Sequence, residues 1–133
     1  MRRCESGQSL VEVALALPIL LVALLGVIEI GRAWSYDLVL QNAAREGAAY
    51  ASRTRGADPV DVARRVCDET GWSTTGSCPG LTVTLLQDDD IATVDASYAL
   101  PLITGSMSRV IGGSTLSIHA STTFPVVRSG VGP

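Results

Sequence analysis

The chain has 133 residues, enough for one small domain and a membrane segment, and 47% of them are hydrophobic, with a mean hydropathy of +0.32. Its formal net charge is −3, and its basic residues are arginines scattered along the chain. Because they form no basic face interleaved with aromatic rings, the composition argues against a nucleic-acid partner.

The first seven residues form a short charged leader with Arg2, Arg3 and Glu5. Positive charge before the first membrane segment keeps that end in the cytoplasm. We therefore predict a cytoplasmic N-terminus, with the chain beyond the membrane segment outside. Arg2-Arg3 is a poor twin-arginine signal, because Glu5 and later polar residues interrupt the approach to the apolar run.

An uncharged apolar run extends from Val13 to Ile28, which as a helix covers roughly 24 Å at about 1.5 Å per residue. Flanking residues bring it to the roughly 20 residues that cross a bilayer. Pro18 removes one backbone hydrogen bond within the run, and we interpret it as a kink or local unwinding rather than an end. We expect a lipid bilayer around a transmembrane helix at 8–34, after a leader at 1–7.

The residues after the run mark the outer membrane interface, since aromatic rings and arginine favour the headgroup level. These residues are Glu29, Arg32, Trp34 and Tyr36. Apolar positions then recur every three or four residues, so the helix is expected to continue to about residue 55. Its small residues are Ala43, Ala44, Gly47, Ala48 and Ala51. They predict either ordinary packing on the chain's own sheet or a dedicated contact between subunits.

The remainder, within an extracytoplasmic domain at 35–133, predicts a second helix and three strands. Asp58 and Pro59 start a helix that runs to about Thr70 before Gly71. Alternating patterns then indicate strands at 81–86, 93–100 and 115–121, with Asp88, Asp89 and Asp90 as a polar turn between the first two. Residues 101–113 are expected to form a crossing segment with a helical turn around 106–111, and 129–133 a frayed tail. The fold class is therefore α+β: a long N-terminal membrane-spanning helix, a short second helix and a small three-stranded antiparallel sheet.

Three cysteines, Cys4, Cys67 and Cys78, occur in the chain. Removal of the leader at 1–7 leaves Cys67 and Cys78, and outside the cytoplasm two thiols favour a disulfide. Such a bond ties the second helix to the loop before the first strand. A zinc site using both cysteines and His119 is the alternative, although the spacing fits no known zinc finger and a tetrahedral site needs a fourth ligand.

The chemistry-bearing segment is Gly7 to Glu12, which reads GQSLVE. A glycine before the cut, a glutamate fifth after it and a hydrophobic helix are typical of a type IV prepilin-like processing site. Cleavage after Gly7 creates a free amine on Gln8, which shares a helix face with Glu12 four residues later. Glu12 can then neutralise its own terminus or that of a neighbouring subunit, so processing is expected to control assembly. The plainer interpretation is a membrane anchor with a stray carboxylate.

From Gly7 through Arg53 the chain resembles the TadE-like pseudopilins of tight-adherence (Tad/Flp) pilus systems. The resemblance rests on GQSLVEVALALP at 7–18, GVIEIGR at 26–32 and NAAREGA at 42–48. It implies a pseudopilin in the inner, or cytoplasmic, membrane that takes part in pilus assembly and adherence. It also implies a prepilin peptidase, other pseudopilins and pilus assembly membrane proteins as partners.

No residue set predicts an enzyme, a cofactor or a metal. His119, the one histidine, lies in an alternating strand, and the chain has no Gly-x-Ser-x-Gly elbow for a Ser/His/Asp hydrolase. Asp88 to Asp90 lack the spacing of a calcium loop, which favours a solvated turn. The alternatives to a pseudopilin are an uncut single-pass binding or structural protein and a secreted protein. The secreted protein needs a signal-peptidase site, for which Gly31-Arg32-Ala33 is a poor match.

Overall fold

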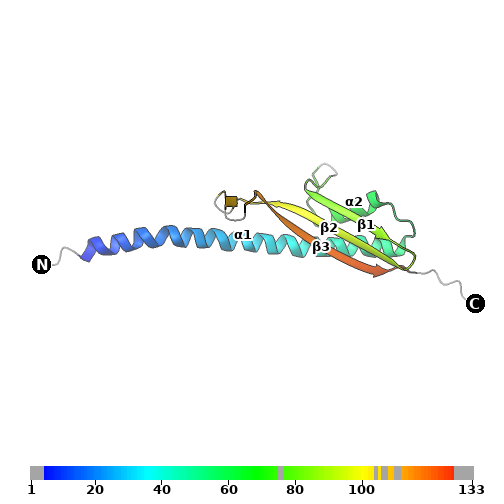
Figure 1. The fold of residues 1–133 in the computed structure, drawn as a ribbon, viewed down its shortest axis with the longest axis horizontal. Helices are drawn as coiled ribbons and strands as arrows, with labels where there is room; N and C mark the ends of the chain where they lie inside the picture. Colours follow the sequence, from blue (N-terminus) through cyan, green and yellow to red (C-terminus); the bar gives the residue numbers. More distant parts are fainter. Residues whose placement is uncertain (1–4, 75–76, 104, 106–107, 110–111, 128–133) are drawn as a thin grey trace, which may run out of the picture.

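The computed structural model describes residues 5–74, 77–103, 105, 108–109 and 112–127. Helix α1, Glu5–Arg53, has 49 residues and runs through Pro18 without ending. Figure 1 shows it as a rod whose C-terminal half carries the rest of the fold, while its N-terminal half extends alone. Among the described residues, one helix is long and apolar enough to cross a membrane, and it is α1.

Helix α2, Pro59–Thr70, begins and ends where the local signals predict. The side chain of Asp58 accepts a hydrogen bond from the Val60 amide at 2.9 Å, which satisfies one free donor of the first turn. Gly71 ends the helix in the left-handed conformation at φ 69°, which costs glycine little. The helix buries Val62 and Val66.

The three strands are β1 (Leu81–Gln87), β2 (Ile91–Pro101) and β3 (Thr115–Pro125). They form one antiparallel sheet in the order β1-β2-β3. The second and third strands are longer than predicted, because their pairing continues through Ile91↔Pro125 and Pro101↔Thr115, beyond the clearest alternation. The aspartate turn joins β1 to β2 as expected, closed by the Asp88 amide donating to the Ile91 carbonyl at 2.8 Å. The helical turn expected at 106–111 falls largely outside the described residues, and the expected frayed tail entirely so.

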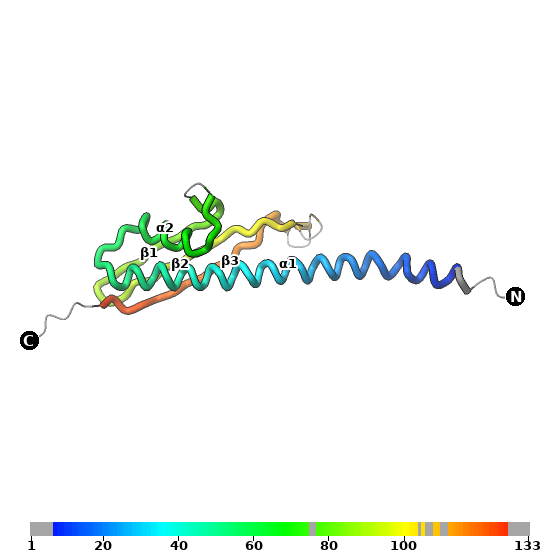
Figure 2. The backbone as a smooth tube through the Cα atoms, turned by 180° about the vertical axis from the view of Figure 1, so that it is seen from behind, coloured from blue at the N-terminus to red at the C-terminus, as the bar shows by residue number. Residues whose placement is uncertain are grey.

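The core lies between the sheet and the two helices. One face of the sheet is buried against α1 and α2, and Figure 2 shows both helices on the same side of it. The small residues of α1 contribute Ala43, Ala44, Ala48 and Ala51, each 0% exposed. The small face therefore packs within its own chain, which was one of the two alternatives for it.

The C-terminal end of α1 is capped by a side chain distant in sequence. Gln87 donates from Nε2 to the carbonyls of Ala51, at 2.8 Å, and Thr54, at 2.9 Å. Its Oε1 accepts from the Ala57 amide at 3.0 Å. Carbonyls in the last turn of a helix lack intrahelical hydrogen-bond donors. The side-chain amide of Gln87 provides a donor there and thereby fixes the end of β1 to the end of α1.

An aromatic cluster closes the other end of the head. The rings of Tyr36 from α1, Trp72 after α2 and Tyr98 from β2 have centroids 4.4–5.7 Å apart. Tyr36, expected at the outer membrane interface, thus packs against two rings of its own chain, whereas Trp34 remains 68% exposed. Edge-to-face and stacked pairs at such spacing contribute about 0.5–1.5 kcal/mol each beyond their burial.

Gly47 lies where α1 meets α2 and β2 most closely, and an added Cβ there falls 2.6 Å from Cγ2 of Val66. We expect Gly47→Ala to lower the free energy of unfolding by about 1–2 kcal/mol, because overpacking costs about 1–3 kcal/mol and the gain in helix propensity returns up to about 1. Thermal unfolding of the full chain in detergent measures this loss. Adding Val66→Ala removes the clashing methyl, so the Gly47→Ala change should then cost less than it does alone. Additive losses would contradict the close contact.

Candidate functional site

Gly7 is the third residue of α1 and lies in its first turn, at an exposed position. A Cβ built on it meets no heavy atom within 4 Å. Glycine inside a helix costs roughly 0.5–1 kcal/mol relative to alanine. The fold of this chain therefore gains nothing from glycine at position 7, and the described contacts give no reason for it.

Gln8 and Glu12 lie one helical turn apart and face each other. The Gln8 side-chain Nε2 donates to Oε1 of Glu12 at 3.4 Å, and both residues are exposed. A backbone amine on Gln8 would lie at the start of this same face, within the reach of one helical turn. Exposed Leu10, Val11 and Val13 surround the pair, so its charge stands at the edge of an apolar surface.

Glu29, at the other end of the apolar run, is only 5% exposed. Its Oε2 is paired with Nη1 of Arg32 at 3.2 Å, and its Oε1 accepts the amide of Ile103 at 3.0 Å. Nη2 of Arg32 donates to the Pro101 carbonyl at 3.4 Å. We name these contacts the Glu29 clasp: Glu29 and Arg32 on α1, joined to Pro101 at the end of β2 and to Ile103 beyond it.

Sequence reasoning placed Glu29 and Arg32 at the membrane boundary but missed the clasp. The spacing of three residues shows that the two charges can pair on one helix. It does not show that the backbone at 101–103 completes the pair, because that contact spans 74 residues of sequence. The apolar stretch Pro101-Leu102-Ile103 was the one available signal that the chain returns to the apolar part of α1.

Cys67 and Cys78 are joined by a disulfide, with Cα atoms 5.8 Å apart. The bond links the last turns of α2 to the segment before β1. It leaves neither sulfur as a thiolate ligand, and the described residues contain no group of three or more His, Cys, Asp or Glu side chains that could hold a metal.

His119 is exposed on β3, where its Nε2 is hydrogen-bonded to Oγ of Ser117 at 2.9 Å. A hydroxyl beside an imidazole is half of a nucleophilic site, which also needs a group that orients the ring. Within the described part of the chain, no carboxylate is hydrogen-bonded to His119. The pair therefore amounts to a solvent-facing contact along one strand.

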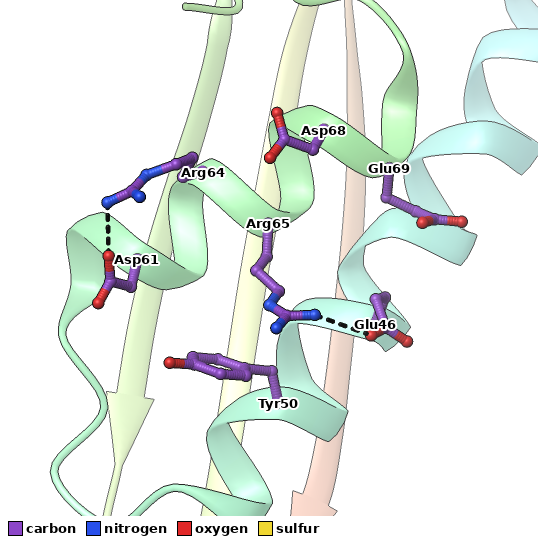
Figure 3. Close-up of a pocket in the computed structure, with 7 residues that line it drawn as sticks. All are labelled: Glu46, Tyr50, Asp61, Arg64, Arg65, Asp68 and Glu69. Carbon is purple, nitrogen blue, oxygen red and sulfur yellow. Dashed lines mark hydrogen bonds and ion pairs between the residues drawn. The ribbon is translucent and has the colours of Figure 1, made fainter. Parts of the chain in front are cut away.

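An open cleft of about 490 Å³ is lined by residues of α1 and α2. Figure 3 shows Arg65 from α2 between the ring of Tyr50, 4.6 Å away, and the carboxylate of Glu46, 3.8 Å away. Arg64 pairs with Asp61 at 2.6 Å along the same helix. Both cations in the cleft thus have partners on the chain itself, and exposed pairs of this kind contribute about 0–1 kcal/mol each. The cleft is therefore the polar groove along which the two packed helices meet.

The family model of TadE-like proteins matches residues 7–49 of the chain. No curated protein and no solved structure matches it. The match covers the GQSLVE segment, the apolar half of α1 and the small residues under the sheet as far as Ala48. It supports a Tad pilus-associated protein, and the apolar helix within it is a candidate single-pass membrane anchor. The resemblance is therefore confirmed over residues 7–49, where the chain matches the TadE-like family model.

Proposed function

We propose that this protein is a pseudopilin that a prepilin peptidase cuts after Gly7 and that then takes part in assembly of a Tad/Flp-type pilus. The mature chain starts at Gln8 and crosses the cytoplasmic membrane once, with its N-terminus inside and the α+β head outside. Its role is structural rather than enzymatic. Its partners are the peptidase, other pseudopilins and the membrane proteins of the assembly machinery.

The observation that carries the proposal is the TadE-like match beginning at Gly7, a glycine that the fold does not require. The exposed apolar surface of α1 supports it further. Leu15, Ile19, Leu20 and Val22 are each more than half exposed, and a surface of that size on a soluble monomer is unusual. Lipid covers such a rod before assembly, and sister helices can replace lipid afterwards.

The N-terminus of the native chain tests the proposal. Mass spectrometry of the chain from the cell membrane fraction should find Gln8 as the first residue. In cells without a prepilin peptidase, the chain should keep Met1 to Gly7. Retention of Met1 to Gly7 in normal cells would identify an uncut anchored protein, and a start near Trp34 would identify a secreted one. Either result would overturn the proposal.

Glu12 is expected to act after processing. A carboxylate near hydrocarbon costs up to about 2.5–3.5 kcal/mol at a helix centre, and less near an interface, unless a partner neutralises it. The new amine of Gln8, on the same chain or a sister chain, supplies that partner. We expect Glu12→Ala to be cut normally and to reach the membrane, but to fall by about tenfold or more in the sheared pilus fraction, the equivalent of losing about 1.4 kcal/mol of assembly free energy.

Glu46→Ala is the matched control for Glu12→Ala. It removes another exposed carboxylate of α1, one that pairs with Arg65 at the surface of the head. This variant should enter the pilus fraction at the normal level. Normal incorporation of Glu12→Ala would remove the assembly role of that carboxylate, although the site of the cut would still stand.

A further inference from the structure

Ile103 is the most exposed large apolar residue of the described head, at 69%. It lies two residues after the end of β2, and its backbone is held to α1 by the Glu29 clasp. Glu29 is the first charged residue after the apolar run that ends at Ile28. Ile103 therefore lies level with the end of the apolar run of α1.

Two contacts of the clasp fix the position of Ile103 along α1. The amide of Ile103 binds the Glu29 carboxylate at 3.0 Å, while the Pro101 carbonyl accepts from Arg32 at 3.4 Å. A carboxylate at the edge of the hydrocarbon is tolerated where a cation and a hydrogen-bond donor satisfy it, and Glu29 has both. Figures 1 and 2 both show the corresponding ends of β2 and β3 pointing along α1 towards its bare N-terminal half.

We propose that Ile103 inserts into the outer leaflet at the boundary between headgroups and acyl chains, as a second membrane contact of the head. This inference rests on α1 spanning the membrane, as proposed above. The occupant is lipid because the residue continues the apolar surface of α1 at the same depth, where Ile28 and Ile30 are also exposed. A single helix leaves a head free to rock about its axis, whereas a helix and a side contact together fix the tilt of the head.

Leu86 offers a matched control within the same head. It is 61% exposed on β1 and lies beside Gln87, which binds the C-terminal end of α1. Ile103 lies beside Glu29, so about 25 helical residues, or roughly 37 Å along α1, separate the two positions. Both side chains are apolar and exposed, but only Ile103 is level with the membrane.

A fluorescent label at each position tests the proposal on the full chain. The background is Cys4→Ser, with Cys67 and Cys78 left as a disulfide, and the added changes are Ile103→Cys or Leu86→Cys. Each thiol carries an environment-sensitive nitrobenzoxadiazole label, and the chain is placed in phosphatidylcholine–phosphatidylglycerol vesicles with or without lipid spin-labelled near the headgroup. We expect the spin label to lower emission at position 103 roughly twofold, because the label would lie within about 5–10 Å of the headgroup boundary. Emission at position 86 should not change.

Two results would overturn the proposal. Equal emission with and without spin-labelled lipid at position 103 would place Ile103 in water. A blue-shifted label that lipid does not quench would place it against protein.

Glu29→Ala in the labelled chain should reduce the quenching at position 103 while circular dichroism remains that of the folded head. Unchanged quenching would show that the clasp does not set the depth of Ile103. The vesicle experiment needs an anchored chain but no cut after Gly7, so its failure is distinct from failure of the pseudopilin proposal.

Discussion

Gly7→Val should leave the chain uncut. A peptidase that accepts glycine before the cut holds the backbone closely there, and a β-branched side chain both fills that space and stiffens the backbone. Even one extra methylene in a fitted pocket changes a specificity constant about 10–200-fold, so three added carbons next to the cut should lower processing by at least about a hundredfold. The intact mass of the membrane-bound chain measures this loss, since Met1 to Gly7 would be retained.

Gly31→Val provides the control, because Gly31 is the equivalent glycine at the other end of the apolar run. An added Cβ meets nothing within 4 Å at either position, so neither change disturbs the described fold by a clash. Both place a β-branched residue at an exposed site of the same helix. Gly31→Val should be cut as fully as the native chain. A Gly7→Val chain that also begins at Gln8 would show that the peptidase does not recognise this glycine.

Local rules were sufficient to predict the helices. The second helix begins after Asp58 and stops before Gly71 because the cap donor, the proline and the left-handed glycine each act within a few residues. The helix α1 was predicted to end near residue 55 and ends at Arg53. Strand existence was equally local, since alternation of buried and exposed residues in β2 follows from its own sequence.

What sequence reasoning missed depends on contacts between distant segments. The capping of α1 by Gln87 spans more than 30 residues, and the clasp between Glu29 and Ile103 spans 74. A polar side chain at the end of a strand gives no sign of which helix end it will meet. The cluster of Tyr36, Trp72 and Tyr98 likewise brings together three distant segments, and the sequence of none of them identifies the others. Sequence periodicity shows which face is buried, but only the assembled fold shows its partners.

The candidate site divides in the same way. Gly7, Gln8 and Glu12 could be singled out from the sequence because the proposed processing signal is a short contiguous stretch. The structure brings Gln8 and Glu12 side by side. The Glu29 clasp could not be predicted as a unit, because half of it is backbone at the end of β2 and just beyond it. Residues that serve partners outside the fold, as proposed for Gly7, stand out in the structure by having no internal reason to be what they are.

Removing the disulfide is expected to produce the largest loss of stability in the head. In the chain-entropy model, a bond that closes a loop of about 12 residues contributes about 3 kcal/mol. We expect the double variant Cys67→Ser, Cys78→Ser to lose about that much free energy of unfolding, with a melting temperature about 10–20 °C lower for a head of this size. Thermal unfolding of the full chain in detergent, followed by near-UV circular dichroism, measures the change.

Cys4→Ser is the control for that double variant, since Cys4 belongs to the leader at 1–7 and takes no part in the bond. Its melting temperature should equal that of the native chain. Adding a reductant to the native protein should reproduce the loss seen in the double variant and should not affect the double variant itself. Equal melting of the native chain and the double variant, oxidised and reduced, would show that the bond does not stabilise the head.

The loss should be large because this core is built mainly of small side chains. Leu40, Leu100, Val62, Val66 and Val94 are its largest fully buried residues, and much of the rest is alanine. Each alanine buries little apolar area, at roughly 25 cal/mol per Å², so a small head gains less from burial than one filled with leucine and phenylalanine. The alanines are what let α1 lie close under α2 and the sheet, and the same choice leaves the head dependent on a covalent link. That link also sets the position of Trp72, which lies between the two cysteines in sequence and completes the aromatic cluster. Near-UV dichroism from this cluster should therefore weaken before helix content does as the double variant is heated.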